Sequence, residues 1–132
     1  MLITLKKKMN TNYINFLGFI EDKIINKFFM EATIFLALDI GDFKLNMHEA
    51  LLNHIPCIVS EETQIDNLLS KSGYVIKTNG TPKDLALKIK EFSFLIRNKK
   101  ESFKKNILEE YLSTITWEEY HKKMIKIVKN GK

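Results

Sequence analysis

The sequence of 132 residues contains little cysteine, proline or glycine: it has one cysteine, two prolines and five glycines. A single cysteine excludes an intramolecular disulfide, and so few prolines and glycines exclude a fibrous repeat or a low-complexity chain. Long apolar runs are also missing. The longest, residues 33–38, is far too short to cross a bilayer, and three lysines interrupt the first ten residues, where a signal peptide needs an apolar core. These absences predict a cytoplasmic protein.

The composition is that of one globular domain. Hydrophobic residues make up 45% of the chain and charged residues 28%, and 132 residues fall within the usual range of a single domain. The net charge of +5 is uneven, because residues 1–80 have eight lysines and nine acids whereas residues 81–132 have thirteen basic and seven acidic residues. Solvated helix faces are the favoured explanation, and attraction to an anionic membrane is the alternative. Few aromatics are interleaved with the basic residues, so we expect no nucleic-acid partner.

Apolar patterning alternates between the strand and the helix period over the first eighty residues. The predicted strands are residues 13–17, 33–38, 56–60 and 73–77, and the helices between them are residues 21–32, 44–54 and 64–70. Three helices and no strand follow from Pro82 to Lys129. This order predicts an α/β fold, a Rossmann-like parallel sheet of about four strands with flanking helices and a helical C-terminal third.

Ligands of such sheets bind beyond the carboxyl ends of the strands. These ends are residues 18–21, 39–46, 60–64 and 78–80. In the second of them, Asp42 and Asn46 can cap the following helix, whose free N–H groups suit a diphosphate. With a helix that starts near Asp42, Glu49 lies about two turns in, opposite an exposed Lys44, and its carboxylate can accept hydrogen bonds from a sugar diol.

Residues 41–59 also carry an ordered motif. Gly-Asp-Phe-Lys-Leu begins at Gly41, Glu49 and Ala50 follow, and Pro56 opens the strand Pro-Cys-Ile-Val. Residues 14–20 read Ile-Asn-Phe-Leu-Gly-Phe-Ile, residues 73–76 Gly-Tyr-Val-Ile, and residues 116–120 Thr-Trp-Glu-Glu-Tyr. This series resembles the C-terminal domain of retaining GT-B glycosyltransferases of the glycogen-synthase and mannosyltransferase type (glycosyl transferase group 1). That family's signature reads Glu-Gly-Phe-Gly-Leu, three residues, Glu-Ala, then a Gly-x-Pro-Val-Val strand.

The resemblance implies the C-terminal half of a GT-B fold. Residues 1–132 would form one partial donor-binding domain, truncated at its N-terminus, with alternating strands and helices in residues 1–80 and C-terminal helices in residues 81–132. The implied enzyme is a metal-independent glycosyltransferase of polysaccharide biosynthesis that needs no cofactor. It passes a sugar from a nucleoside diphosphate to a glycan or lipid-linked acceptor. The family's N-terminal acceptor domain and its diphosphate-neutralising Arg and Lys are missing, so we expect this chain alone to be inactive.

The resemblance also implies the substrate contacts. Glu49 corresponds to the family's second Glu, which holds the ribose hydroxyls of the donor. The other substrate-binding positions are Gly18, Phe19 and Ile20, which match the wall of the base site, and Phe43, Lys44, Leu45 and Thr63. The family's first Glu falls on Gly41, which leaves the catalytic residue unknown, with Asp42 or Asp39 as substitutes and helix capping as the competing role of Asp42. Gly41 favours the alternative function, a non-catalytic Rossmann-like module that binds a nucleotide or a protein.

The remaining chemically active side chains have structural explanations. His48 and His54 are six residues apart, off the spacing of a helical metal site, so we expect no metal and place both, with His121, at the surface or at helix ends. Cys57, in a predicted core strand, is expected to be a buried inert thiol. In the helix at residues 44–54 the expected buried residues are Leu45, Ala50, Leu51 and Leu52.

The last helix has an apolar stripe that includes Trp117 and Tyr120. Core packing on the sheet is favoured for this stripe because the connection from Thr114 is short. The alternative is an exposed apolar patch beside lysines, which would favour self-association or contact with the inner membrane surface.

Overall fold

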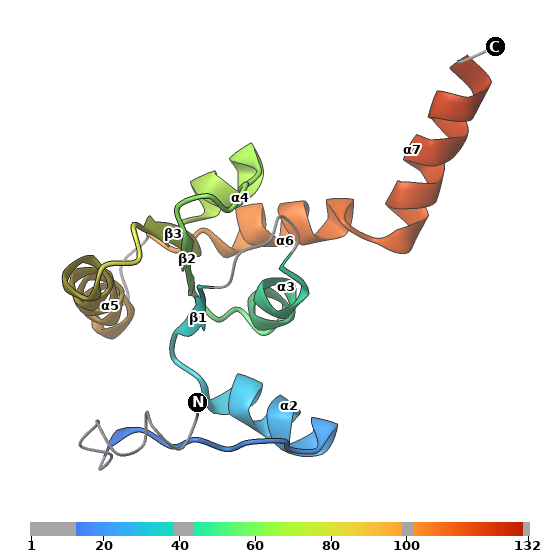
Figure 1. The fold of residues 1–132 in the computed structure, drawn as a ribbon. Coiled ribbons are helices and arrows are strands. Elements are labelled where there is room, and N and C mark those ends of the chain that lie inside the picture. Colours follow the sequence, from blue (N-terminus) through green and yellow to red (C-terminus); the bar gives the residue numbers. More distant parts are fainter. Residues whose placement is uncertain (1–12, 39–43, 99–101, 131–132) are drawn as a thin grey trace.

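The computed structural model describes residues 13–38, 44–98 and 102–130, and at positions 120, 123, 124, 127, 128 and 130 it describes the backbone alone. The elements in chain order are α2 (Asp22–Glu31), β1 (Phe35–Ala37), α3 (Leu45–Leu52), β2 (Cys57–Ser60), α4 (Asn67–Ser72), β3 (Val75–Thr78), α5 (Pro82–Arg97), α6 (Lys105–Thr114) and α7 (Trp117–Asn130). Strands and helices alternate as far as β3 and only helices follow, so the expected α/β organisation is confirmed (Figure 1).

The three strands form one parallel sheet in the order β1-β2-β3. Phe35 pairs with Cys57, and Cys57 pairs with Val75, so the strands are aligned from their first residues. The central strand β2 is buried along its whole length, as a continuous apolar run predicts for a parallel strand covered on both faces. One helix, α3 or α4, lies in each crossover between neighbouring strands.

The described sheet has three strands and not about four, because residues 13–17 do not form one. Tyr13 is 93% exposed and Leu17 is 48% exposed. Aromatic and β-branched residues favour a strand only where a neighbouring strand supplies hydrogen bonds and packing. The described sheet consists of β1, β2 and β3, and residues 13–17 pair with none of these strands.

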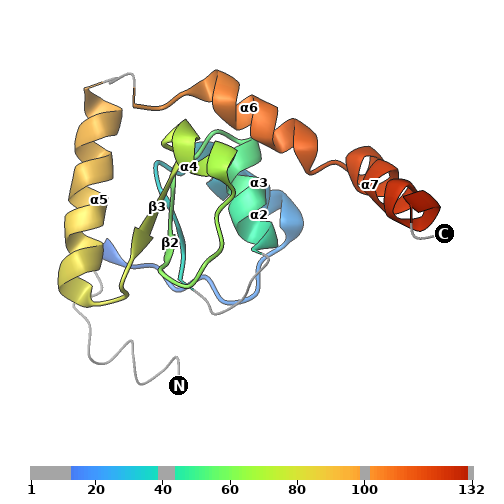
Figure 2. The same ribbon diagram turned by 90° about the horizontal axis from the view of Figure 1, so that it is seen from above.

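Helices cover both faces of the sheet. α5 lies on one face, and α3, α4 and α6 lie on the other (Figures 1 and 2). Leu51 of α3, Cys57 of β2 and Leu108 of α6 are fully buried in the core between the sheet and this second layer. On the α5 side, the ring of the buried Phe92 packs edge-on against Phe103, with the ring centroids 5.8 Å apart.

Gly73 fixes the junction between α4 and α6. Its φ of 77° is in the left-handed region, where glycine is favoured at the end of a helix. A Cβ at this position would lie 2.1 Å from the backbone oxygen of Ser102. The amide of Lys104 donates to the carbonyl of Ser72 over 2.8 Å. The chain that enters α6 is thus held against the end of α4, which brings α6 over α3.

α7 extends away from the rest of the molecule. In both views it continues outward from the end of α6, which crosses beside α4 (Figures 1 and 2). Trp117 is 78% exposed. The expectation that this helix docks on the sheet with Trp117 in the core is therefore wrong, because only Ile115 and Thr116 separate α7 from α6 and α6 already ends beyond the sheet. None of the described helices combines the length and the apolar character needed to cross a membrane.

Candidate functional site

Glu49, the residue that the motif selects, is the fifth of the eight residues of α3. This helix begins at Leu45 and not near Asp42, so Glu49 is about one turn into it and not two. Lys44 occupies the N-cap position without a side-chain cap, and Asn46 accepts a hydrogen bond from the amide of Met47 over 2.9 Å. Asp42, the expected cap, lies outside the described residues.

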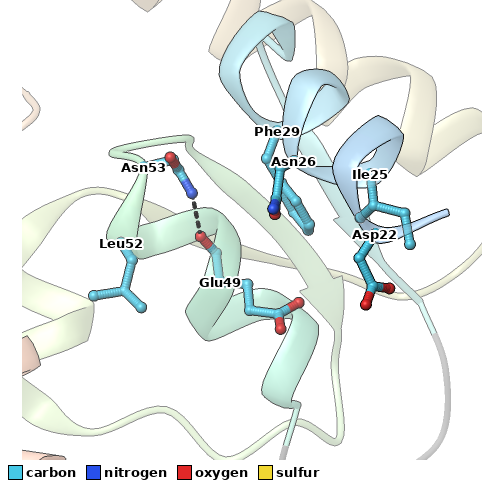
Figure 3. A pocket seen from close by; sticks show the side chains of 7 residues that line it. All are labelled: Asp22, Ile25, Asn26, Phe29, Glu49, Leu52 and Asn53. Carbon is cyan, nitrogen blue, oxygen red and sulfur yellow. Dashed lines mark hydrogen bonds between the residues drawn. The ribbon is translucent and has the colours of Figure 1, made fainter.

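Glu49 contributes to a cavity of about 460 Å³ between α2 and α3. The lining residues are Asp22, Ile25, Asn26 and Phe29 from α2 and Glu49, Leu52 and Asn53 from the end of α3 (Figure 3). The carboxylates of Asp22 and Glu49 lie on facing sides of the cavity (Figure 3). Its volume is within the range of small-molecule sites.

The chemistry of this cavity suits a neutral polyhydroxyl group. Two carboxylates provide hydrogen-bond acceptors, and the amide of Asn26 provides a donor and an acceptor. Phe29 and Ile25 supply apolar surface. None of the described residues that line the cavity is a lysine or an arginine. A phosphate inside it would therefore meet like charge, whereas a sugar diol could donate its hydroxyl protons to the carboxylates.

A buried polar cluster occupies the opposite side of α3. It consists of Lys44, His48, Ser60, Thr63 and Tyr111. The Lys44 Nζ donates to Ser60 Oγ over 3.3 Å. The imidazole of His48 bridges α3 and α6, since its Nδ1 lies 2.8 Å from the carbonyl oxygen of Lys44 and its Nε2 lies 2.9 Å from Tyr111 Oη. Burial, with a smaller effect of Asp66, raises the pKa of Tyr111.

Two expectations about this helix were wrong. Lys44 is 2% exposed and His48 is 7% exposed, whereas both were expected at the surface. Leu45 and Leu52 were expected in the core and are exposed. The residues that α3 turns inward are Lys44, Met47, His48, Ala50 and Leu51. The spacing of residues 44, 47, 48 and 51 is that of a single helical face, and this periodicity is the signal that predicts the burial of Lys44 and His48.

Thr63 lies beside Ser60 and not beside Glu49. Its amide donates to the carbonyl of Ser60 over 3.1 Å, and its side chain is 1% exposed. The Thr63 hydroxyl has no hydrogen-bond partner among the described residues. Lys44 and Thr63, both expected to contact substrate, thus meet at Ser60, and neither is among the residues that line the cavity at Glu49.

The expected wall of the base site does not line this cavity either. Gly18 has a φ of 68° with open space around it, and Phe19 is 99% exposed. Ile20 is half-buried. The remaining expected contact in α3, Leu45, is 63% exposed, and Phe43 lies outside the described residues, as do Gly41 and Asp39.

Asp22 and Asn26 are the cavity residues that the sequence reasoning missed. Both lie on α2, which begins directly after residues 18–21, one of the expected ligand-binding ends. An acid in the first turn of a helix usually stabilises the helix dipole, and Asp22 fits this role, so its sequence position alone did not indicate a ligand contact. The signal that could have predicted a ligand contact is the position of Asp22 directly after residues 18–21, an expected ligand-binding end.

The other polar candidates have structural roles. No group of three potential metal ligands occurs among the described residues. His54 follows α3 with a φ of 58°, and His121 is exposed on α7, as expected for a helix end and a surface position. Cys57 is fully buried, as expected, and burial raises the pKa of its thiol from 9.0 to about 12.

Comparisons of this chain with protein-family models, with curated proteins and with solved structures found no match. The likeness to retaining glycosyltransferases stays a prediction, which depends on the motifs of residues 14–20, 41–59, 73–76 and 116–120 and on the position of Glu49.

Proposed function

We propose that this chain is the donor-binding part of a retaining glycosyltransferase that transfers a sugar from a nucleoside diphosphate to a glycan or lipid-linked acceptor. The observation that supports this proposal most strongly is the position of Glu49. The motif selects this residue as the ribose ligand without reference to any cavity, and Glu49 lines a cavity of suitable size together with Asp22.

In this proposal the ribose diol lies between α2 and α3. Glu49 and Asp22 accept hydrogen bonds from hydroxyl groups, and Phe29 and Ile25 cover apolar surface of the nucleoside. The diphosphate lies outside this acidic cavity, toward the start of α3, where free backbone N–H groups and the helix dipole favour an anion. The cavity then recognises the uncharged part of the donor, and the helix end recognises the charged part.

The sheet order supports the same proposal. Ligands of doubly wound sheets bind beside the first strand after the switch point, at its carboxyl end. The order β1-β2-β3 is that of the strands after such a switch point. In the sequence, α2 comes directly before β1 and α3 comes directly after it. We propose donor binding as the role of the residues in this chain.

The second candidate function is a non-catalytic module that binds a nucleotide or a protein. Gly41, at the position of the family's first Glu, favours it, since glycine has no side chain with which to contact the transferred sugar. For a module that binds a nucleotide, the two proposals differ in whether the attached sugar adds to the affinity.

Calorimetry with uridine, guanosine and adenosine diphosphates and their glucose conjugates tests these proposals. We expect weak binding of one base, which Glu49→Ala weakens by about 5- to 150-fold, because a bound diol without its acceptor costs about 1–3 kcal/mol. Glu110→Ala, at an exposed position of α6 outside the expected ligand-binding ends, is the matched control. Unchanged binding by the Glu49 variant would reject the site. Equal affinity for the nucleotide and its sugar conjugate would favour the non-catalytic module.

A further inference from the structure

α7 exposes large apolar side chains to solvent. It extends away from the sheet in both views (Figures 1 and 2). Trp117, in its first turn, is 78% exposed, and Ile125, two turns further on, is 55% exposed. Large apolar side chains on a projecting helix lose favourable transfer energy unless another surface covers them.

The sequence of α7 separates its lysines from its apolar positions, and His121 is the polar residue that falls among the apolar ones. At about 100° per residue, the apolar positions fall within an arc of roughly 160°. These positions are 117, 120, 124, 125, 127 and 128, and the opposite side contains all four lysines of the helix, at positions 122, 123, 126 and 129. The acids Glu118 and Glu119 lie in the first turn. The helix is therefore amphipathic, with a polar side that becomes basic toward its C-terminal end.

Ion pairs with the residues that the structure describes neutralise only part of the charge on this side. Lys122 pairs with Glu119, with its Nζ 2.6 Å from the carboxylate. Lys126 and Lys129 form no ion pair with any residue that the structure describes. The partner that covers the apolar side must therefore also accept a positive charge next to it.

We propose that α7 lies on an anionic lipid surface, with its apolar side in the headgroup and acyl boundary and its lysines at the lipid phosphates. A helix with lysines on one side and tryptophan and aliphatic residues on the other has the pattern of an interfacial helix. A second copy of the chain could cover the apolar side but would bring eight lysines close to only four acids. A nucleic acid would neutralise the lysines but leave the apolar side in water. An anionic bilayer satisfies both sides.

Partition of the full chain into vesicles tests this proposal. Vesicles of phosphatidylcholine with about 30% phosphatidylglycerol are expected to bind the chain, and pure phosphatidylcholine vesicles to bind it far more weakly, since each lysine near an anionic surface changes the partition coefficient about fivefold. Trp117 is the single tryptophan, so its emission reports on α7 alone. Binding should shift this emission to the blue, and brominated lipids should quench it.

The double variant Lys126→Gln/Lys129→Gln should partition about 25-fold more weakly, two steps of about fivefold. The matched control Lys83→Gln/Lys90→Gln removes the same charge from exposed positions of α5 and should stay within about twofold of the parent, because those positions lie away from the bound surface. Ile125→Asn should weaken partition about tenfold or more by removing apolar burial.

Three results would overturn the proposal: equal binding to both kinds of vesicle, an equal loss in the α5 control, or a dimer by sedimentation that leaves vesicles unbound. The last would assign the apolar side to a second copy. Glu49→Ala should leave partition unchanged, so the outcome is independent of the nucleotide site.

Discussion

The two sides of α3 differ in burial, charge and hydrogen bonding. Toward α2, Glu49 faces Asp22 across an open cavity, and none of the described lining residues is basic. Toward α6, Lys44 and His48 are buried and bonded to Ser60 and Tyr111. A buried polar group must keep its partners for the chain to fold, whereas an open carboxylate makes little difference to stability. The comparison therefore assigns stability to the α6 side, and it leaves the α2 side open for the ligand that we propose.

The largest expected effect is on the buried side. His48→Ala should lower the free energy of unfolding by about 2–4 kcal/mol, because it removes the bridge to Tyr111 and leaves a cavity between α3 and α6. Urea denaturation followed by circular dichroism measures this loss. His121→Ala, at an exposed position of α7, is the control and should change stability by less than about 0.5 kcal/mol. Equal stabilities of the two variants would contradict the structural role of His48.

Tyr111→Phe is expected to have a smaller effect, about 1 kcal/mol, because it removes only the hydroxyl that contacts His48. Its effect should depend on pH. Burial raises the pKa of Tyr111 above the ordinary value of 10.0, so the contribution of the neutral phenol is fully present below pH 10.0 and is lost as the pH rises through the folded pKa.

Unfolding measured from pH 8 upward should therefore show the parent losing stability faster than Tyr111→Phe above pH 10.0. Parallel losses in the two proteins would mean that Tyr111 titrates as freely as in the unfolded chain. The double variant with His48→Ala should cost less than the sum of the single variants, since both remove the same hydrogen bond.

Most of the secondary structure follows from the sequence. A threonine followed by a proline is a sequence signature of a helix start, and at the start of α5 the Thr81 hydroxyl accepts a hydrogen bond from the amide of Asp84 over 3.3 Å. The strand at β2 was expected from its apolar run. These elements depend on residues that are close in the sequence, so local patterns are sufficient to predict them.

What the sequence did not predict depends on contacts distant in the chain. The burial of His48 requires Tyr111, 63 residues away, and no local pattern places α6 over α3. Residues 13–17 have the composition of a strand, but a strand forms only where a neighbour is available. The cavity at Glu49 forms only because α2 lies beside α3. No local sequence pattern predicts this contact between the two helices.

Asp84 allows a smaller test of the same contrast, because it is a partly buried carboxylate that accepts two hydrogen bonds. Thr78 Oγ1 donates to Asp84 Oδ2 over 2.7 Å, and the amide of Asn79 donates to the same oxygen over 3.0 Å. The hydrogen bond from Thr78 has the largest effect and that from Asn79 the next, and both lower the pKa of Asp84 below 3.8. Their stabilisation is present above pH 3.8 and is lost as the pH falls through the folded pKa. An NMR titration should show the pKa returning toward 3.8 in Thr78→Val, and an unchanged pKa would contradict this account.

The smallest expected effect on stability is that of Glu49→Gln. Glu49 is exposed and forms no ion pair with the described residues. Its backbone oxygen accepts a hydrogen bond from the Asn53 side chain, and a change of the Glu49 side chain does not remove this bond. The free energy of unfolding should therefore change by less than about 0.5 kcal/mol, while affinity for the nucleoside diphosphate falls, because glutamine has one acceptor oxygen where glutamate has two. Asp22→Asn should behave in the same way. If both carboxylates hold one diol, the double variant should lose less affinity than the sum of the two single losses. A large loss of stability in Glu49→Gln would mean that this side of α3 is also structural.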